Sequence, residues 1–430
     1  MRKNIFLVLC CFMIFSVVLA GCGNNTDSDS PAATAAPTAN TPAPVEEAKP
    51  VEKVPVTFVT NYNPKLFEEL EAAFEAKNAD IDLQFTFMDN AQTQKILAAQ
   101  FAAGEGPDIA PFDLNAIKAG YALPLDDQPM VSRLGDAVKL AAQIDGKIYS
   151  LPFETWFQGM MYNVKIFADH NIQVPKTWDE FIEACKKLKA AGIKPISAGD
   201  KDGDVIGKMA LGVVLSTGAI IEPDIEAGKT TYSERWKTGL EEFYRIVKED
   251  IIGTDAFGMS VDDMLNEFLT GKAAMISMGN WQVADMHTKA PDFEFNIFPY
   301  PAVAGGEQWA VGGIGGGGGV NVHSKHQAEA LRVLDFIATP EGDALYIKGT
   351  RGGPTIKGVQ GGLDPSLSGL QDALGAGRVY APWAGFKKIN GESFVRLWFK
   401  TSQEIVSGRK TVDQGLKAID EYVAAQLKLQ

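Results

Sequence analysis

Val54-Pro-Val-Thr-Phe-Val-Thr60 decides the fold class of this chain, because it begins an alternation of strand and helix signals. The run is apolar and β-branched, which predicts a strand. Leu66, Phe67, Leu70 and Phe74 follow at helical spacing. The next segments predict a strand at 81–87, a helix at 91–103 and a strand at 108–112. Alternation of this kind is typical of an α/β fold with a largely parallel sheet.

The same alternation continues to the end of the chain. Two helix starts are marked by capping boxes, Thr177 with Glu180 and Thr411 with Gln414. Since 430 residues are too many for one small core, we expect two or more folding units. Further strands are expected at 148–153, 159–162 and 273–278, and further helices at 177–191, 233–248, 326–338 and 411–427.

The N-terminal segment predicts export. Arg2 and Lys3 precede an apolar run from Ile5 to Val18, and small residues follow, which is the order of a secretory signal peptide over residues 1–21. Leu19-Ala-Gly-Cys22 is similar to the bacterial lipobox, in which the cysteine thiol receives a diacylglyceryl group and becomes the mature N-terminus. We therefore expect Cys22 to be lipidated.

Two acyl chains hold a protein stably at a membrane, so the expected location is the extracytoplasmic face of the cell membrane. Two alternatives stay open: an ordinary secretory signal with a chance cysteine, or a short membrane helix. The apolar run is short for the second, because a bilayer span needs ~20 apolar residues.

Residues 22–53 predict a disordered linker. The segment contains Ser, Thr, Asn, Pro and Ala, then Glu and Lys, and almost nothing that could form a core. In an extended form with ~3.1 Å per residue, it could reach on the order of 90 Å. Order is expected to begin near Val54.

Charge and cysteine content exclude several classes of function. A formal net charge of -14 argues against binding to nucleic acid or to anionic lipid. Cys10 and Cys11 lie in the signal and Cys22 is expected to carry lipid, which leaves Cys185 without a disulfide partner. Its apolar neighbours at helical spacing predict a buried core thiol.

Three weaker motifs do not predict a cofactor or a metal. Gly313, Gly315 and Gly318 match a nucleotide-binding glycine pattern, but a strand signal follows them where a helix should open. The aspartates of 200–204 lack the glycine and the glutamate of a calcium loop. The histidines of 323–326 have no cluster of ligating residues around them. No cofactor, metal ion or catalytic residue is therefore expected.

A series of short motifs follows in a fixed order. They are Gly104-Glu-Gly-Pro-Asp-Ile109, Gly120-Tyr-Ala-Leu-Pro-Leu-Asp126, Asp145-Gly-Lys-Ile-Tyr-Ser-Leu-Pro152 with Met161-Tyr-Asn163, Pro175-Lys-Thr-Trp-Asp-Glu-Phe181, Gly271-Lys-Ala-Ala-Met275 with Gly279-Asn-Trp281, and Ser407-Gly-Arg-Lys-Thr-Val412. Together they resemble the family 1 extracellular solute-binding proteins, the maltose-binding-protein-like subunits of sugar ABC importers. The resemblance covers about residues 54–430.

This resemblance implies two α/β lobes joined by hinge strands, with a ligand cleft between them. The chain should cross between the lobes just after Pro152, near Gly312 to Val322, and within 370–385. The expected segments are 54–153 and 315–378 for the first lobe, and 154–314 and 379–430 for the second.

A sugar site needs aromatic faces for the C–H surface of the ring and polar groups for its hydroxyls. In α/β proteins such groups gather at the carboxyl ends of strands. By resemblance, Phe112, Trp156 and Trp281 match family positions that line the sugar. We expect Trp281 and one of the other two to stack on sugar rings, and Asp113, Asn115 and Glu154 to bind hydroxyls. The remaining candidates are Asn61, Tyr62, Asp204, Trp309, Gly313 and Trp383.

Asp204 marks a departure from the family pattern. Ser197-Ala-Gly-Asp-Lys-Asp-Gly203 is similar to a family stretch that often continues into Trp, and here Asp204 stands in that place. An acidic group in place of a stacking group puts the size and identity of the ligand in doubt.

The resemblance implies a monomeric receptor that captures a sugar or an oligosaccharide by hinge closure and delivers it to the permease of an ABC importer. It contacts the membrane through its lipid anchor alone, binds no nucleic acid and performs no chemistry. Two other functions stay open. One is an exported glycan hydrolase or lyase that uses carboxylates such as Asp113 and Glu154. The other is a sensory protein that presents its ligand to a membrane kinase.

Overall fold

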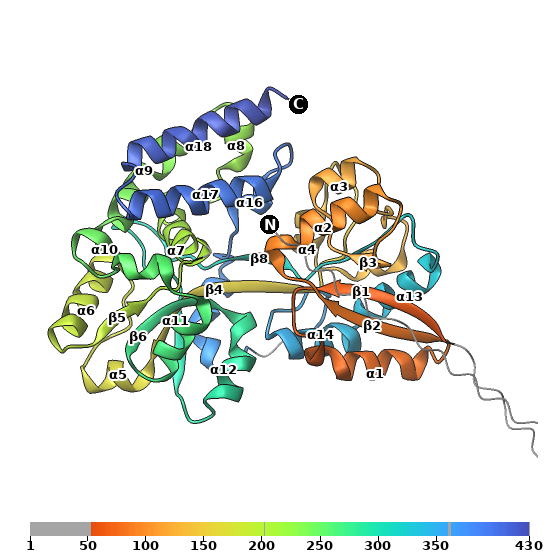
Figure 1. Ribbon diagram of the computed structural model, residues 1–430, viewed down its shortest axis with the longest axis horizontal. Helices are drawn as coiled ribbons and strands as arrows, with labels where there is room; N and C mark the ends of the chain where they lie inside the picture. Colours follow the sequence, from red (N-terminus) through yellow and green to blue (C-terminus); the bar gives the residue numbers. More distant parts are fainter. Residues whose placement is uncertain (1–52, 202, 360–362, 430) are drawn as a thin grey trace, which may run out of the picture. The chain divides into compact units, whose positions relative to one another are not determined.

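The computed structural model describes residues 53–201, 203–359 and 363–429, which fall within one compact unit, Val51–Gln430 (Figure 1). The expected signal peptide of residues 1–21 and the lipidation site Cys22 lie outside the described residues, as does the expected linker up to residue 52. Two β-sheets, each packed against its own hydrophobic core, organise the described unit. Among the described helices, none is both long enough and apolar enough to cross a membrane.

The first sheet has the strand order β2-β1-β3-β9, and with its core it forms the first lobe. β1 (Val54–Thr60) lies between β2 (Ile81–Phe87) and β3 (Ile109–Ala110) and runs parallel to both. β9 (Gly319–Val320) joins β3 in the antiparallel direction. The predicted parallel arrangement is confirmed for β1, β2 and β3. The helices that contact this sheet or one another in this lobe include α1 (Glu68–Lys77), α13 (Gln327–Ile337) and α14 (Pro340–Thr350).

The second sheet has the order β5-β6-β4-β7, with β8 paired to β4, and it forms the second lobe. β5 (Lys194–Ser197) and β6 (Ala273–Gly279) are parallel. β4 (Glu154–Asn163) runs antiparallel to β6, to β7 (Phe295–Phe298) and to β8 (Val311–Gly315). The prediction of a largely parallel sheet is therefore wrong for this lobe. β4 brings the chain into the lobe and β8 takes it out, so these two strands must run in opposite directions.

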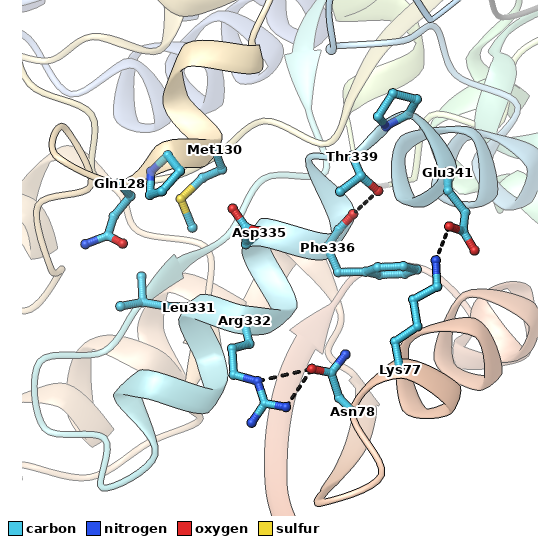
Figure 2. Close-up of a pocket in the computed structure, with 12 residues that line it drawn as sticks. Lys77, Asn78, Gln128, Met130, Leu331, Arg332, Asp335, Phe336, Thr339 and Glu341 are labelled. Atoms are coloured by element: carbon cyan, nitrogen blue, oxygen red, sulfur yellow. Dashed lines mark hydrogen bonds and ion pairs between the residues drawn. The ribbon is translucent and has the colours of Figure 1, made fainter.

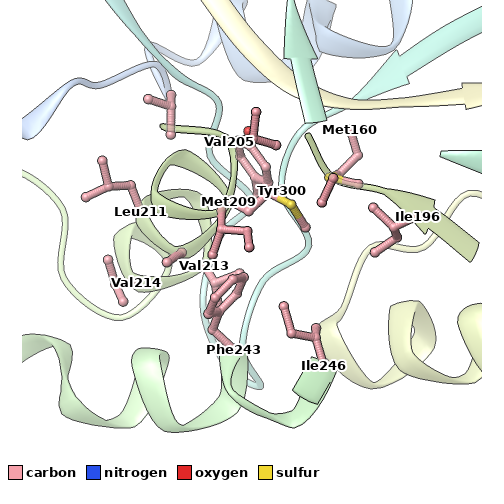
Figure 3. Packing of buried hydrophobic residues seen from close by; sticks show 14 of the residues in the cluster. Met160, Ile196, Val205, Met209, Leu211, Val213, Val214, Phe243, Ile246 and Tyr300 are labelled. Carbon is pink, nitrogen blue, oxygen red and sulfur yellow. The ribbon is translucent and has the colours of Figure 1, made fainter. Parts of the chain in front are cut away.

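Helix α7 (Asp204–Leu215) is the centre of the second core, and most of its side chains are buried. It packs against α9 (Tyr232–Phe243) and α17 (Gly391–Val406), which lie far from it in sequence. Figure 3 shows Tyr300 among Val205, Met209 and their neighbours in this core. Apart from Asp204 and Lys208 near its start, the helix is apolar on all sides because it is covered on all sides.

Two capping boxes fix helices of the second lobe at the predicted places. Thr177 accepts a hydrogen bond from Glu180 N at the start of α6 (Trp178–Ala190). Thr411 does the same for Gln414 N at the start of α18 (Val412–Leu427). Cys185, on the buried face of α6, has no exposed surface and forms no disulfide, which confirms the prediction of a core thiol.

The first two crossings between the lobes lie where the sequence predicts them. β4 begins at Glu154, immediately after Pro152 and Phe153. β8 ends at Gly315 in the second sheet, and β9 begins at Gly319 in the first. The glycine run at 312–319 therefore connects two strands and does not open a helix.

The predicted third crossing, within 370–385, is wrong. Ile356 packs in the first core, whereas Leu367 and Leu370 pack in the second, so the chain crosses between 356 and 367. The 3-10 helix η5 (Pro365–Leu370) packs on β7, which places it in the second lobe and not in the first-lobe segment 315–378. The described residues beside the crossing, 351–359 and 363–364, contain only isolated bridges, at Gly353 and Ile356, so no periodic pattern marks it.

Three predicted elements differ locally. Residues 148–153 form no strand, and only Leu151 makes a bridge, to Gly318; Pro152 has no N–H with which to extend the pairing. The strand predicted at 108–112 is reduced to β3. The helix predicted at 233–248 breaks at Tyr244 into α9 and α10 (Arg245–Lys248).

The other helices are short connections or caps around the two sheets. They are η1 (Pro64–Phe67), α2 (Asn90–Ala102), α3 (Leu114–Lys118), η2 (Pro129–Arg133), α4 (Asp136–Ala142), α5 (Val164–Asp169), α8 (Glu222–Glu226), η3 (Thr254–Gly258), α11 (Val261–Leu269), η4 (Asn280–Gln282), α12 (Val283–Lys289), α15 (Gln371–Gly375) and α16 (Pro382–Gly385).

Gly212 allows α7 to approach Tyr300, and we expect Gly212→Ala to destabilise the protein. A Cβ atom at this position would lie 2.0 Å from Cδ2 of Tyr300. The ring is buried, so the helix or the ring must move, at a cost of about 1–3 kcal/mol that outweighs the better helix propensity of alanine. Thermal unfolding measures the change. Gly375→Ala is the control, since a Cβ there meets no atom within 4 Å; equal melting temperatures for the two variants would contradict the packing argument.

Candidate functional site

A pocket of about 310 Å³ lies between the two lobes. The first lobe contributes Phe112 and Asp113 from the segment after β3, together with Ser150 and Pro152 before the first crossing. The second lobe contributes residues of 383–392, and Gly315 and Gly317 from the second crossing close its base. The pocket therefore lies beside the hinge, with chain segments from both lobes in its walls.

Three tryptophan side chains from separate segments meet beside this pocket. Trp156 on β4 stacks on Trp383 of α16, with ring centroids 5.8 Å apart and planes at 21°. Trp281 of η4 meets the edge of Trp156 at 5.9 Å and 65°. All three are partly buried and pack against the second core. Trp383 also lines the pocket. The sequence predicts each of these residues as a site candidate but does not predict that they contact one another.

Glycines make room for two of these indoles. A Cβ at Gly315 would lie 2.5 Å from Cδ1 of Trp156, and a Cβ at Gly279 would lie 2.0 Å from Cζ3 of Trp281. Neither glycine could become alanine without moving a ring. Gly313 has a different role, because it is the β8 residue paired with Trp156 in the ladder and it does not line the pocket.

Asn280 fixes the turn that carries Trp281. Its side chain is fully buried, accepts a hydrogen bond from Phe157 N at 2.9 Å and donates one to Thr350 O at 3.1 Å. The asparagine thus joins the end of β6 to β4 and to the end of α14. Buried polar groups with both partners satisfied hold a single geometry, which orients the neighbouring tryptophan.

The two lobes touch at the mouth of the pocket. Asn390 Nδ2 of the second lobe lies 3.4 Å from Oδ2 of Asp113, and Lys387 Nζ donates to Gln143 O at 3.2 Å. Asp113 also caps α3 by accepting from Ala116 N at 2.8 Å. Phe112 stacks on Phe101 with centroids 4.8 Å apart, which orients its ring in the pocket wall.

Glu154 and Tyr62 form a pair at the hinge and do not line the pocket. The Tyr62 hydroxyl donates to Oε1 of Glu154, whose side chain is 1% exposed. Burial raises the pKa of Glu154 to about 7, and the hydrogen bond from Tyr62 partly offsets that rise. Burial and the neighbouring Glu154 raise the pKa of Tyr62 as well. The sequence predicts both residues as ligand contacts; in this structure neither lines the pocket, and they lie where the end of β1 meets the start of β4.

Asp204 lies within reach of the tryptophan cluster through Lys208. Oδ2 of Asp204 is 2.9 Å from Lys208 Nζ, and this ammonium lies 5.2 Å from the ring centroid of Trp281. A cation over an indole face is an attractive arrangement. The acidic residue that departs from the family pattern is therefore matched by a base one helical turn later.

The remaining candidates lie outside the pocket. Asn61 and Asn115 are exposed and line no pocket wall. Trp309 pairs with Tyr300 by a backbone bridge and packs, partly buried, on the second core. These three therefore have no contact with the pocket in this arrangement of the lobes.

Sequence reasoning missed several residues of the pocket and its border. Ser150 contributes a hydroxyl oxygen that is buried and has no partner among the described residues. Asn390 caps the start of α17 and Glu392 is the second residue of that helix, where the sequence has no recognisable motif. Lys208 could have been found, since it stands four residues after Asp204.

A larger hollow of about 710 Å³ lies on the first lobe, among α1, η2, α13 and α14 (Figure 2). Its charged side chains already pair with one another: Arg332 with Asp80 at 2.6 Å, Lys77 with Glu341, and Arg133 with Asp335. The aromatic ring in its wall, Phe336, is buried. We take the smaller inter-lobe pocket as the functional site, because it has an aromatic wall, segments of both lobes and a buried hydroxyl, that of Ser150, with no partner among the described residues.

No group of three or more potential metal ligands is assembled within the described residues. His326 lies 3.4 Å from Asp108, whose carboxylate also accepts from Ser324 and from Thr57. That cluster ties β3 to β1 and to the loop before α13. A structural role accounts for its polar groups.

Comparison with known proteins gives one family. The family model described as "Bacterial extracellular solute-binding protein" matches residues 60–344. The multiple sugar-binding protein of Streptococcus mutans is 24% identical over 330 residues, which cover 73% of this chain and 77% of that protein. The melibiose/raffinose/stachyose-binding protein MelE of Bacillus subtilis is 25% identical over 313 residues, 68% of this chain and 70% of that one.

Solved structures agree with the fold described above. A family 1 extracellular solute-binding protein from Bifidobacterium longum subsp. infantis superposes with a TM-score of 0.68 at 25% identity, covering 87% of this chain and 100% of that one. A sugar transporter from Bacillus licheniformis in complex with stachyose gives 0.70 at 18% identity, covering 87% and 100%.

The raised pKa of Glu154 predicts a pH-dependent stability that Glu154→Gln removes. Because the carboxyl has a pKa of about 7 when folded and about 4.5 when unfolded, the folded protein holds this proton more tightly. Its contribution is complete below pH 4.5 and is lost as the pH rises through 7, by on the order of 3 kcal/mol.

We expect Glu154→Gln to lose less stability than the wild type between pH 5 and pH 8, as measured by thermal unfolding across that range. Glu69→Gln is the control, because Glu69 is exposed on α1 and pairs with Lys348. A Glu154→Gln variant that keeps the full pH dependence of the wild type would refute this assignment.

Proposed function

This chain belongs to the bacterial extracellular solute-binding proteins, and from that premise we propose that it is a carbohydrate-binding receptor of an ABC importer. It captures a sugar or an oligosaccharide in the inter-lobe pocket and delivers it to the permease. The observation that carries the proposal is the cluster of Trp156, Trp281 and Trp383 beside a pocket with polar walls. Relatives that bind raffinose and stachyose by name support the ligand class.

The chemistry of the walls suits a sugar. An indole face covers the C–H surface of a pyranose and adds large buried area at low entropic cost. Asp113, Asn390 and the Ser150 hydroxyl offer acceptors and donors for ring hydroxyls. A site built for hydroxyls rejects ligands that lack them, because its polar groups would stay unpaired.

Hinge closure is the proposed mechanism of capture. The pocket walls belong to both lobes, and the lobes are joined by the crossing segments next to the pocket. A ligand that contacts both walls binds the closed form better than the open form and shifts the population toward it. The contacts of Asn390 with Asp113 and of Lys387 with Gln143 support a closed form that the lobes can reach.

The two carboxylates that the sequence offers for hydrolysis, Asp113 and Glu154, are not placed to act together. A hydrolase would need two carboxyls facing one glycosidic bond, but Glu154 is buried against Tyr62 and Asp113 caps α3. We propose that the receptor is a monomer with no chemistry of its own. A sensory role would use the same pocket and differs only in the membrane partner.

We also propose that the receptor is lipidated at Cys22 and held at the extracytoplasmic face of the cell membrane. The support is the order of charged, apolar and small residues before Cys22. The polar segment that follows, up to residue 53, would give the binding domain reach from the surface.

A thermal-shift screen against oligosaccharides tests the ligand class, because a ligand raises stability by an amount set by its concentration over Kd. We expect a shift with at least one sugar from a panel that includes raffinose and stachyose, and none with peptides or amino acids. Trp383→Ala should weaken the hit by roughly ten-fold or more, through loss of about 1–3 kcal/mol of ring contact. Phe87→Ala, an exposed aromatic on β2, is the control. Binding of peptides but of no sugar would overturn the proposal.

Cell fractionation tests the anchor. The wild type should be found in the membrane fraction and incorporate a labelled fatty acid, whereas Cys22→Ser should lose the label and leave the membrane fraction. Cys11→Ser changes another cysteine of the same region and should behave as the wild type. Retention of the label by Cys22→Ser would place the modification elsewhere.

A further inference from the structure

Helix α8 carries two glutamates, Glu222 and Glu226, that both contact the segment 380–390. They are four residues apart, so they lie on one face of the helix. The contacted segment is more than 150 residues away in sequence, and it supplies much of the second-lobe wall of the pocket. α8 itself contributes no residue to the pocket lining.

Glu222 is completely buried between two tyrosines. It accepts hydrogen bonds from the hydroxyls of Tyr380 at 2.5 Å and Tyr232 at 3.2 Å. Tyr232 is itself fixed, because its backbone N–H donates to Asp420 at 2.8 Å. Gly385 leaves the space for this arrangement: a Cβ there would lie 2.0 Å from the Tyr380 hydroxyl and 3.1 Å from Oε2 of Glu222.

Glu226 accepts hydrogen bonds from three consecutive backbone N–H groups. Oε1 accepts from Lys387 N at 3.1 Å, Lys388 N at 2.8 Å and Ile389 N at 3.3 Å. Hydrogen bonds to a carboxylate are stronger than those between neutral groups. The three donor residues lie outside any helix or strand, so the Glu226 carboxylate supplies the acceptor that a helix or strand would otherwise provide.

The segment between these two anchors carries the pocket residues. Tyr380 bonds to Ala310 and Gly312 of the second sheet, and Trp383 follows it and stacks on Trp156. Lys387 and Asn390, at the other end, reach across to the first lobe. A shift of the segment would therefore move the stacked indole and both inter-lobe contacts together.

The turn that leads into α8 is strained. Ile220 has a φ of 56° and is 57% exposed. A left-handed conformation is unfavourable for a β-branched residue, and neither burial nor a glycine relieves it here. Strain of this kind persists where the surrounding structure fixes the backbone, and Ile220 stands two residues before Glu222.

We infer that Glu222 and Glu226 are positioning residues of the binding site, which hold the segment 380–390 so that Trp383 stacks on Trp156 and the pocket wall is formed before the ligand arrives. The affinity part of this inference rests on the proposed sugar-binding function. A preformed wall spares the ligand the cost of ordering it, so loss of either anchor should weaken binding without a change in any residue that touches the sugar.

Glu226→Ala and Tyr380→Phe remove one anchor each, and neither residue lines the pocket. The first readout is the near-ultraviolet circular dichroism of ligand-free protein, since stacked indoles interact through their transition dipoles. Trp383→Phe identifies the part of the spectrum that the pair supplies. Both anchor variants should keep the far-ultraviolet spectrum of the wild type and lose most of the Trp156–Trp383 signal.

The second readout is the Kd of whichever sugar the screen identifies. Both variants should weaken binding by roughly ten-fold, as expected for one lost hydrogen-bonded anchor. Asp224→Ala is the matched control on the same helix, because Asp224 is exposed and pairs with Lys229; it should keep both the signal and the Kd.

A folded Glu226→Ala or Tyr380→Phe with the indole signal of the wild type would overturn the inference. If Glu226→Ala does not fold, the milder Tyr380→Phe, which loses one hydroxyl, decides the question. If the wild type binds no sugar, the proposed function fails, but the ligand-free spectra still test whether α8 positions the tryptophan pair.

Discussion

The antiparallel pairing of β4 with β8 is the constraint on which the rest of the structure depends. Glu154 pairs with Gly315 and Trp156 with Gly313, so the strand that enters the second lobe is bonded to the strand that leaves it. The hinge and the binding site are therefore built on the same few residues. Glycines on β8 have no side chains, which leaves room for the Trp156 ring over the ladder. Hinge motion of the lobes would take place about this ladder, so the indole of Trp156 would stay in place while the pocket walls move.

Two buried glutamates are hydrogen-bonded to tyrosines close to this ladder. Glu154 accepts from Tyr62 near the first crossing, and Glu222 accepts from Tyr380 in the segment beside β8. Burial raises the pKa of both carboxyls to about 7. Such a pair adds little net stability, because burying a charge costs on the order of several kcal/mol, which is close to what its hydrogen-bond partners contribute. Its effect is geometric. A carboxyl hydrogen-bonded to a tyrosine fixes the distance and the angle between two segments, which apolar packing alone specifies less sharply.

Local patterns predicted most of the fold. β1, β2, β6, α6 and α18 follow from apolar periodicity and capping boxes, which depend on neighbours in sequence. The third crossing could not be predicted, since the described residues beside it belong to no helix or strand. Trp156, Trp281 and Trp383 could each be selected as candidates, but their contacts with one another depend on the tertiary structure. The place of Glu154 in the hinge stretch suggests a ligand contact, whereas in this structure its side chain is buried against Tyr62 and does not line the pocket. Glu222 and Glu226 give no signal at all, because their partners lie in a segment more than 150 residues further along the chain.

The first sheet is completed late in the chain. Ile109 of β3 pairs with Val320 of β9, so the first lobe cannot close its sheet until the whole first part of the second lobe has left the ribosome. Pairings between residues so distant in sequence form slowly, because the loop between them must close first. β9 is the edge strand of this sheet, so a chain truncated before Gly319 would lack that edge even though β1, β2 and β3 precede the second lobe in sequence.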